Sequence, residues 1–267
     1  MKPVTIVRGS GPIILGQPHS GTYLPDDIFA QLNDLGRQLR DTDWHIPRLY
    51  DGLLDNVTIV RANFSRYVID ANRDPEGTSL YPGQNTTALV PTSTFDNEPI
   101  WRVSPTESDI AHRLESYHRV YHAAMEAEIA RIKARHGVAV LYDCHSIRSE
   151  IPYLFDSRLP DLNIGDNSGQ TCAPAITASV AAACALSKAY SHVVNGRFKG
   201  GWTTRHHGRP EAGVHAIQME LAQRCYLTSE VPPFAYADSR ASELRQLLRT
   251  ILTAVQDKAK SILMTEI

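Results

Sequence analysis

Cysteine is scarce in this sequence, and long apolar runs are absent. The four cysteines, Cys144, Cys172, Cys184 and Cys225, form no Cys-x-x-Cys pair, which argues against a structural zinc finger and against a disulfide framework. No apolar stretch approaches the roughly 18 residues that a membrane-spanning helix requires. These absences argue against a disulfide-stabilised framework and against a membrane-spanning helix, and they favour an ordinary globular protein.

An excess of charge of either sign is also lacking. Lysine and arginine number 27 against 29 aspartates and glutamates, which gives a formal net charge of −2. Proteins that bind nucleic acid or anionic membranes usually carry a dense basic patch, and no basic run here suggests one. The first residues lack the apolar core of a signal peptide. We therefore expect a cytoplasmic protein that binds a small molecule and works as a monomer or small homo-oligomer.

The chain has enough residues and enough apolar side chains for one sizeable core. Its 267 residues are 42% hydrophobic, which predicts a single domain over residues 1–267. Apolar runs of strand length alternate with helical patterns, and this predicts an α/β fold with a mixed, largely parallel sheet flanked by helices. The strand candidates are residues 13–16, 57–62, 67–70, 138–142, 192–195 and 214–220. The helix candidates are residues 44–54, 104–136, 173–189 and 239–262.

The helix predicted at residues 104–136 has the most readable ends. Ser104 is a good N-cap, Pro105 suits the first helical position, and Glu107 completes a capping box. Gly137 provides the stop signal. Two long connections, at residues 74–103 and 146–171, each follow a strand end that carries polar residues. Long loops in compact domains are commonly functional, so we expect these two to cover a substrate.

Polar side chains follow several of the predicted strands. His19 and His145 each end an apolar run, and Glu220 ends a third run. In α/β sheets, ligands bind outside the carboxyl ends of the strands. Two histidines, a carboxylate and a further glutamate are the components of a hydrolytic zinc centre. The sequence therefore predicts His19 and His145 as metal ligands, with Zn2+ or another divalent ion bound between them.

The third ligand is less closely defined by the sequence. Asp41 and Asp43 stand at the start of a predicted helix, where an aspartate is also an ordinary N-cap. We favour Asp43, and Asp41 and His45 remain alternatives. Glu220 is predicted to be the general base, because a carboxylate is costly to bury without a role. An ion pair with Arg224 or another basic residue is the structural alternative.

Arginine is the residue best suited to bind a substrate carboxylate, because its fork of N–H donors matches the two oxygens. Asn72 and Arg73 follow the strand predicted at 67–70 and could form such a clamp. Arg66 lies seven positions before Arg73, and an ideal strand would place the two on opposite faces. The chain must therefore bend between them if both face one pocket.

Two further histidine pairs stand out, and only the first has the spacing of a metal-binding motif, because adjacent histidines rarely both bind one metal. His118 and His122 are spaced as in the HExxH motif but lack its glutamate, and we expect them on a solvated or rim face of their helix. His206 and His207 lie in a polar segment with Arg205, and Lys199 precedes them. This segment could contact an anionic substrate through Arg205 and Lys199, or it could be a solvated loop.

The order of these residues along the chain resembles a known group of enzymes. His19, the segment from Arg66 to Arg73, His145 and Glu220 follow one another as do the site residues of zinc carboxypeptidases and aspartoacylase-type deacylases. In detail, the chain is similar to the N-formylglutamate amidohydrolase (deformylase) family. The segments that carry this resemblance span nearly the whole chain: residues 18–21, 41–45, 70–74, 143–146, 195–201 and 218–221.

The resemblance implies a phosphorylase/hydrolase-like α/β fold, one zinc ion, and hydrolysis of the linear amide of N-formyl-L-glutamate in histidine degradation. It also implies a role for each residue that matches. His19 and His145 would be metal ligands, Glu220 would be the base, Asn72 and Arg73 would bind a substrate carboxylate, and Arg66 would polarise the scissile carbonyl.

Thr22 departs from the carboxypeptidase pattern, which has a glutamate ligand at that position. The missing carboxylate is therefore expected from elsewhere, and we assign it to Asp43. A deacylase of another N-acyl amino acid, a small carboxypeptidase, and a metal-free binding module for acidic metabolites are the competing interpretations.

Overall fold

A mixed sheet of seven strands forms the centre of the protein, in the order β1-β3-β2-β4-β7-β5-β6. The computed structural model describes residues 1–78 and 83–265. The central strands β3, β2, β4 and β7 run parallel, β1 and β5 are antiparallel to their neighbours β3 and β7, and β6 is parallel to β5. The strands are β1 (Val4–Val7), β2 (Ile13–Gln17), β3 (Thr58–Ala62), β4 (Ala139–Ile147), β5 (Leu162–Gly165), β6 (His192–Val194) and β7 (Val214–Ala222).

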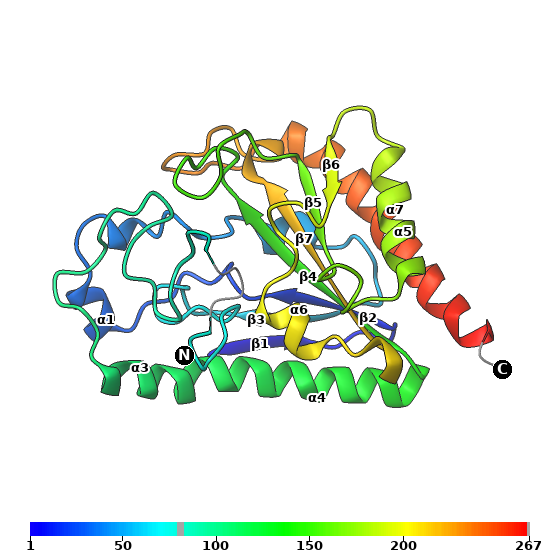
Figure 1. Ribbon diagram of the computed structural model, residues 1–267, viewed down its shortest axis with the longest axis horizontal. Coiled ribbons are helices and arrows are strands. Elements are labelled where there is room, and N and C mark those ends of the chain that lie inside the picture. The colour runs from blue at the N-terminus through cyan, green and yellow to red at the C-terminus, as the bar shows by residue number, and fades with distance from the viewer. Residues whose placement is uncertain (79–82, 266–267) are drawn as a thin grey trace.

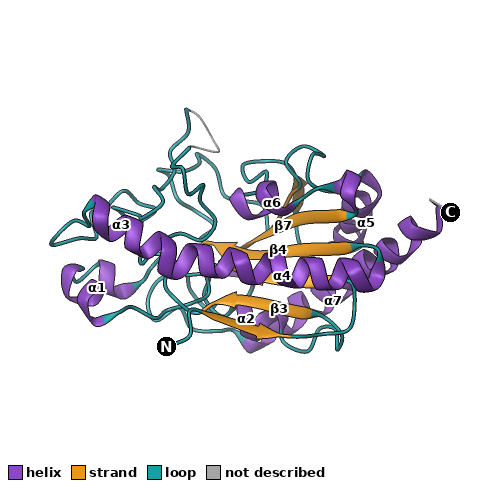
Figure 2. Cartoon of the chain, turned by 90° about the horizontal axis from the view of Figure 1, so that it is seen from below, coloured by secondary structure: helices purple, strands orange, loops and turns teal. Residues whose placement is uncertain are grey.

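Helices cover both faces of this sheet (Figure 1). The α-helices are α1 (Asp26–Gln31), α2 (Ile46–Tyr50), α3 (Glu107–Arg113), α4 (Arg119–His136), α5 (Pro174–Ala185), α6 (Trp202–His207) and α7 (Asp238–Thr265). A π-helical turn, Leu114–His118, joins α3 to α4. In Figure 2, α4 crosses the sheet on the side toward the viewer, α3 continues beyond the ends of the strands, and α7 lies behind the sheet. The predicted α/β fold with a largely parallel sheet is therefore confirmed.

Alternating residues of the central strands enter two separate cores. On β4, Val140 and Tyr142 pack with residues of α5 and α7, whereas Leu141 packs with Tyr121 and Met125 of α4. This follows from the two-residue period of a strand. All residues of β2, β4 and β7 are buried, as their continuous apolar runs predicted. A sheet covered on both faces leaves its strand ends as the place where a polar site can open.

The prediction of a strand at residues 67–70 is wrong. Residues 66–68 form a turn, in which the Ser65 carbonyl accepts from the Val68 amide at 2.9 Å and the Ser65 hydroxyl accepts from the Tyr67 amide at 3.2 Å. A serine hydroxyl that bonds the backbone two residues later favours a turn over a strand. The apolar residues here are buried, which is why the run resembles a strand.

Two other boundaries differ from the sequence-based expectation. The helix that was expected to begin after Ser104 begins at Glu107, with Thr106 as N-cap and Asp109 as the reciprocal carboxylate of the capping box. The same signature thus recurs two residues later. The connection predicted at 146–171 contains β5, whose Asn163 and Gly165 hid the strand pattern. Residues 79–82 of the connection predicted at 74–103 lie outside the described residues.

Candidate active site

Three neighbouring parallel strands bring the predicted site residues to one edge of the sheet. His19 follows the end of β2 by two residues, His145 lies near the end of β4, and Glu220 lies near the end of β7. His145 and Glu220 are directly opposite each other in the β4–β7 register. The topology of the sheet therefore joins residues that lie about 200 positions apart in the sequence.

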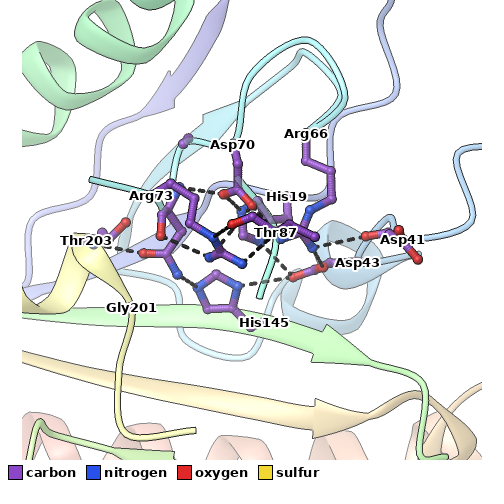
Figure 3. Close-up of polar contacts among 12 residues, drawn as sticks. His19, Asp41, Asp43, Arg66, Asp70, Arg73, Thr87, His145, Gly201 and Thr203 are labelled. Carbon is purple, nitrogen blue, oxygen red and sulfur yellow. Dashed lines mark hydrogen bonds and ion pairs between the residues drawn. The ribbon is translucent and has the colours of Figure 1, made fainter. Parts of the chain in front are cut away.

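His19, Asp43 and His145 form a compact, buried group (Figure 3). The Nδ1 atoms of His19 and His145 lie 3.8 and 3.3 Å from Asp43 Oδ2, and the two ring centroids are 4.9 Å apart. Asp43 is held in place by backbone bonds, because its Oδ2 accepts from the Ser146 amide at 3.1 Å and its own amide donates to the His19 carbonyl at 3.1 Å. The group offers two imidazole nitrogens and one carboxylate oxygen to a single point.

Each of these two imidazoles is oriented by a buried carboxylate on its far side. His19 Nε2 lies 2.6 Å from Asp70 Oδ1, and His145 Nε2 lies 2.9 Å from Asp143 Oδ2. Because a carboxylate only accepts, Nε2 of each ring carries the hydrogen and Nδ1 is the nitrogen that faces Asp43. Such carboxylate–histidine pairs are typical of metal-binding histidines.

The carboxylates and arginines around the group change the pKa values of its side chains strongly. Burial alone would raise the pKa of Asp70, but the positive charges of Arg73, His19 and Arg66 hold it well below its usual value. Burial would lower the pKa of His145, but Asp143 and Asp43 raise it well above its usual value. Burial and the charge of Arg66 lower the pKa of His19, although Asp70 and Asp43 act in the opposite direction. Asp70 is therefore a permanent anion, and the pKa values of the two imidazoles are shifted in opposite directions.

The charge balance of the buried site fits a cation. Four acidic residues lie together here, and Arg66 and Arg73 are the guanidinium groups within 4 Å of them among the residues described. The acidic residues are Asp43, Asp70, Asp143 and Glu220. Two imidazoles and one carboxylate, with room for a fourth ligand, are the donor set of a catalytic zinc site. Other divalent metals accept the same set.

The alternative ligands Asp41 and His45 have other partners. Asp41 Oδ2 accepts from the Tyr67 hydroxyl at 2.8 Å and from the Phe95 amide at 2.9 Å. His45 Nε2 lies 2.9 Å from the Phe234 carbonyl. Neither belongs to the group around His145, so the geometry selects Asp43 among the three residues.

Glu220 is buried beside this group at the wall of the cavity. Its Oε2 accepts from Gln218 Nε2 at 3.3 Å. Burial raises the pKa of Glu220 to about 8, so the carboxyl group can both hold and release a proton near neutral pH. The alternative ion pair with Arg224 does not form, because Arg224 pairs with Asp161 at 2.7 Å.

A cavity open to solvent lies directly over these residues. Arg66, Arg73 and Arg197 line it together with Asn72 and with apolar side chains from several loops. The positively charged lining favours an anionic ligand.

Arg66 and Arg73 both reach the cavity because the chain turns between them. Arg66 Nη2 donates to Asp70 Oδ2 at 2.7 Å, and its Nη1 donates to the Asp41 carbonyl at 3.1 Å. Its guanidinium also lies over the Phe95 ring. Arg73 Nη2 donates to the Thr87 hydroxyl at 2.8 Å. The bend that the spacing of the two arginines required is thus supplied by the turn at residues 66–68.

Asn72 is fixed between α6 and β4. Its Oδ1 accepts from the Thr203 amide at 2.8 Å, and its Nδ2 lies 3.2 Å from His145 Nε2. A Cβ atom at Gly201 would lie 2.2 Å from this side chain, so only glycine allows α6 to approach it. Gly201 also donates from its amide to Gln218 Oε1 at 2.9 Å. The loop before α6 therefore shapes one wall of the cavity.

The basic residues that were predicted to contact the substrate near α6 are not the ones that reach the cavity. Among the residues described, Arg197 lines it, whereas Arg205 and Lys199 do not. Arg197 Nε donates to the Leu154 carbonyl and its Nη2 to the Asn85 carbonyl, both at 3.0 Å. Arg197 was not predicted as a site residue, although it lies within the segment 195–201 that carries the family resemblance.

His118 and His122 are buried, so the prediction of a solvated or rim face is wrong. His118 Nε2 lies 3.0 Å from the Arg73 carbonyl, and His122 Nε2 lies 2.7 Å from the Ala71 carbonyl. The segment at 206–207, expected as part of a polar loop, belongs to α6 and covers them, with His207 Nε2 3.0 Å from His122 Nδ1. The two histidines thus hold the backbone on either side of Asn72.

A sheet whose parallel strands open onto a charged cavity is the arrangement of an α/β enzyme, and comparison with known proteins defines which one. A family model described as N-formylglutamate amidohydrolase matches residues 11–227. This chain belongs to the N-formylglutamate amidohydrolase family.

Relatives of known sequence and structure agree with this assignment. The chain is 45% identical to an N-formylglutamate deformylase of Pseudomonas aeruginosa over 93% of its length and 94% of the relative's. It is 41% identical to one from Pseudomonas putida, over 95% and 96% of the two chains. The crystal structure of N-formylglutamate amidohydrolase from Ralstonia eutropha has the same fold, with a TM-score of 0.79 at 23% identity over 95% of this chain and 98% of that one. Among the described residues, no helix is both long and apolar enough to span a membrane.

Proposed function

We propose that this protein hydrolyses N-formyl-L-glutamate to formate and L-glutamate with the aid of one bound zinc ion. The observation that carries the proposal is the convergence of His19, Asp43 and His145 beside Glu220, in a cavity that arginines line. The substrate is inferred from the two relatives from Pseudomonas, which are N-formylglutamate deformylases. The reaction belongs to histidine degradation, as the family resemblance implies.

His19 Nδ1, His145 Nδ1 and a carboxylate oxygen of Asp43 would hold the metal. When bound there, the ion would lower the pKa of water and polarise a carbonyl oxygen. The carboxylates of Asp70 and Asp143 keep the Nε2 hydrogens in place, so both rings present an unprotonated Nδ1 to the cation.

Glu220 carries the proton through the reaction. In its ionised form it accepts a proton from the attacking water, whose oxygen bonds to the formyl carbon. It then returns this proton to the amide nitrogen as the C–N bond breaks, which releases formate and the free amino group of glutamate. A carboxylate whose pKa is raised to about 8 by burial is a stronger base than an exposed one, so it takes the proton from water more readily.

Arg66 would stabilise the negative charge that develops on the formyl oxygen. Its guanidinium is fixed by Asp70, by the Asp41 carbonyl and by the Phe95 ring, so little reorganisation is needed during the reaction. Loss of such a donor typically slows a reaction by about 100- to 1000-fold.

The two carboxylates of the substrate require two cationic groups. Asn72 and Arg73 would bind one of them. We assign the second to Arg197 in place of Arg205 or Lys199, because Arg197 lines the same cavity. A guanidinium at each end of the substrate would select for an acidic amino acid.

The test is a substrate panel on the purified protein with measured metal content. N-formyl-L-glutamate should release formate, while N-acetyl- and N-succinyl-glutamate and short peptides should react much more slowly. Preference for an acetylated substrate or for peptides would move the protein to the alternative deacylase or carboxypeptidase class. Protein that lacks stoichiometric metal and catalyses none of these reactions would be a binding module for acidic metabolites.

A further inference from the structure

A second group of metal-ligating side chains lies outside the cavity, where α6 packs beside α4 (Figure 1). We name the four imidazoles gathered there the α4–α6 histidine cluster; its members are His118, His122, His206 and His207. The Trp202 ring packs between them, with its centroid 4.5 Å from that of His122 and 4.0 Å from that of His206. Glu126 of α4 lies at the outer edge of this cluster.

Three ligand atoms at this outer edge are close enough to share one ion. Glu126, His206 and His207 each offer one such atom, and all three atoms lie within 4.8 Å of one another. Glu126 Oε1 and His206 Nε2 are 3.2 Å apart. Two ligands bound at about 2.0–2.2 Å to a tetrahedral zinc ion lie roughly 3.4 Å apart, so this pair already has suitable spacing. The His206 ring is held by stacking on Trp202 at an angle of 13°.

Hydrogen bonds determine which nitrogen of His207 can bind a metal. The Ala71 carbonyl can only accept, so His122 Nε2 carries a hydrogen. A neutral His122 ring has no second hydrogen, so its Nδ1 accepts from His207 Nε2, 3.0 Å away. Nδ1 is therefore the unprotonated nitrogen of His207.

We expect His207 to use the same principle as the first centre. There, a ring donates from Nε2 to a buried acceptor and presents Nδ1 to the cation. We propose that Glu126, His206 and His207 form a second, peripheral cation site, which binds Zn2+ or a similar imidazole-preferring transition metal. Mg2+ and Ca2+ prefer all-oxygen sites and should not bind it.

Nearby positive charge should make this site weaker than the first one. The charge of Arg209 acts on His207, and the site contains one carboxylate against the several of the first centre. Arg209 Nη1 donates to the carbonyls of Arg205 and Gly208, which lie at the C-terminal end of the same helix. Occupancy would connect α6 to α4, and His207 and His122 would transmit this constraint to Ala71.

Metal titration of the holoenzyme tests the proposal. After dialysis against metal-free buffer, calorimetry and equilibrium dialysis with Zn2+ and with Co2+ should reveal one additional saturable equivalent, and Mg2+ should reveal none. Glu126→Gln and His206→Gln should each weaken this additional binding at least tenfold, because each removes one ligand. Both positions are partly exposed, so both variants should fold.

Two surface substitutions serve as matched controls. Glu115→Gln and His112→Gln change exposed residues of the same helical segment and should leave the additional equivalent unchanged. The proposal is overturned if the holoenzyme takes up no saturable equivalent beyond the first. It is equally overturned if Glu126→Gln and His206→Gln both bind metal as the parent does. The result does not depend on the proposed reaction, because binding alone is measured.

Discussion

The protein contains two groups of buried histidines, and their hydrogen-bond acceptors distinguish them. At the sheet edge, His19 and His145 donate to the carboxylates of Asp70 and Asp143. Between α4 and α6, His118 and His122 meet the neutral carbonyls of Arg73 and Ala71. Carboxylates favour positive charge on or beside an imidazole, whereas burial against a carbonyl keeps the ring neutral. The comparison teaches that the acceptor behind a histidine indicates its role better than burial or spacing does.

The strongest test of the first group is the removal of its proton carrier. Glu220→Gln keeps the size of the side chain but cannot take a proton from water, so kcat should fall by about 100- to 10,000-fold. The metal content should stay unchanged, because Glu220 is not one of the three proposed ligands. Glu211→Gln, at an exposed position, is the control. Near-native turnover of the Glu220→Gln protein would show that another group moves the proton.

The carboxylates behind the ligands should matter for metal affinity. Asp143→Asn removes the charge that orients His145, and such changes typically weaken binding by about 10- to 100-fold. Competition with a chromogenic chelator measures this change. Asp257→Asn, at the exposed surface of α7, should bind metal as the parent does. Equal affinities in the two variants would remove the distinction drawn here between carboxylate and carbonyl acceptors.

The α4–α6 histidine cluster, whose buried rings are neutral, should instead determine how the free energy of unfolding changes at acidic pH. The pKa of His207 is about 3 in the folded protein and near 6.5 when unfolded, so the unfolded state binds more protons between these values. Stability is therefore complete above about pH 6.5 and falls as the pH decreases toward 3. For this one group the loss between pH 7 and pH 5 amounts to about 2 kcal/mol.

Denaturant unfolding at the two pH values measures this loss. In His207→Gln, the free energy of unfolding should change by about 2 kcal/mol less between pH 7 and pH 5 than it does in the parent. His112→Gln, exposed on α3, should show the parental dependence. If His207→Gln is as acid-sensitive as the parent, His207 is not held neutral.

A smaller effect is expected on substrate binding. His122→Phe removes the donor to the Ala71 carbonyl and loosens the backbone next to Asn72 and Arg73. Loss of one such bond costs about 1 kcal/mol, so KM for N-formyl-L-glutamate should rise by roughly fivefold, with a smaller change in kcat. His122→Asn, which retains an N–H donor, should recover part of the loss. A fall in kcat at constant KM would assign His122 a different role.

Much of the site could be predicted from the sequence because strand ends obey a topological rule. Residues that follow apolar runs in parallel strands meet at the same sheet edge, and this rule correctly predicts that His19, His145 and Glu220 lie together. The same reasoning could favour Asp43 as the third metal ligand, but it could not decide between Asp43 and the alternatives Asp41 and His45. Its position depends on the Ser146 amide, a contact across 103 residues.

The features that the sequence did not reveal depend on packing between distant segments. The run at residues 67–70 is as buried as a strand. The chain turns there because the carbonyl and the hydroxyl of Ser65 accept hydrogen bonds from the amides of Val68 and Tyr67. Burial of His118 and His122 requires α6, which lies about 80 residues later and approaches only because Gly201 has no side chain. No local pattern in α4 could show that a neighbouring helix would cover its histidines.

Anomalous diffraction at the zinc absorption edge, from crystals of the protein purified without added metal, tests the central claim most directly. We expect a strong peak within bonding distance of His19 Nδ1, His145 Nδ1 and an oxygen of Asp43. A crystal with no peak at this position, or with its metal bound elsewhere in the cavity, would contradict the account.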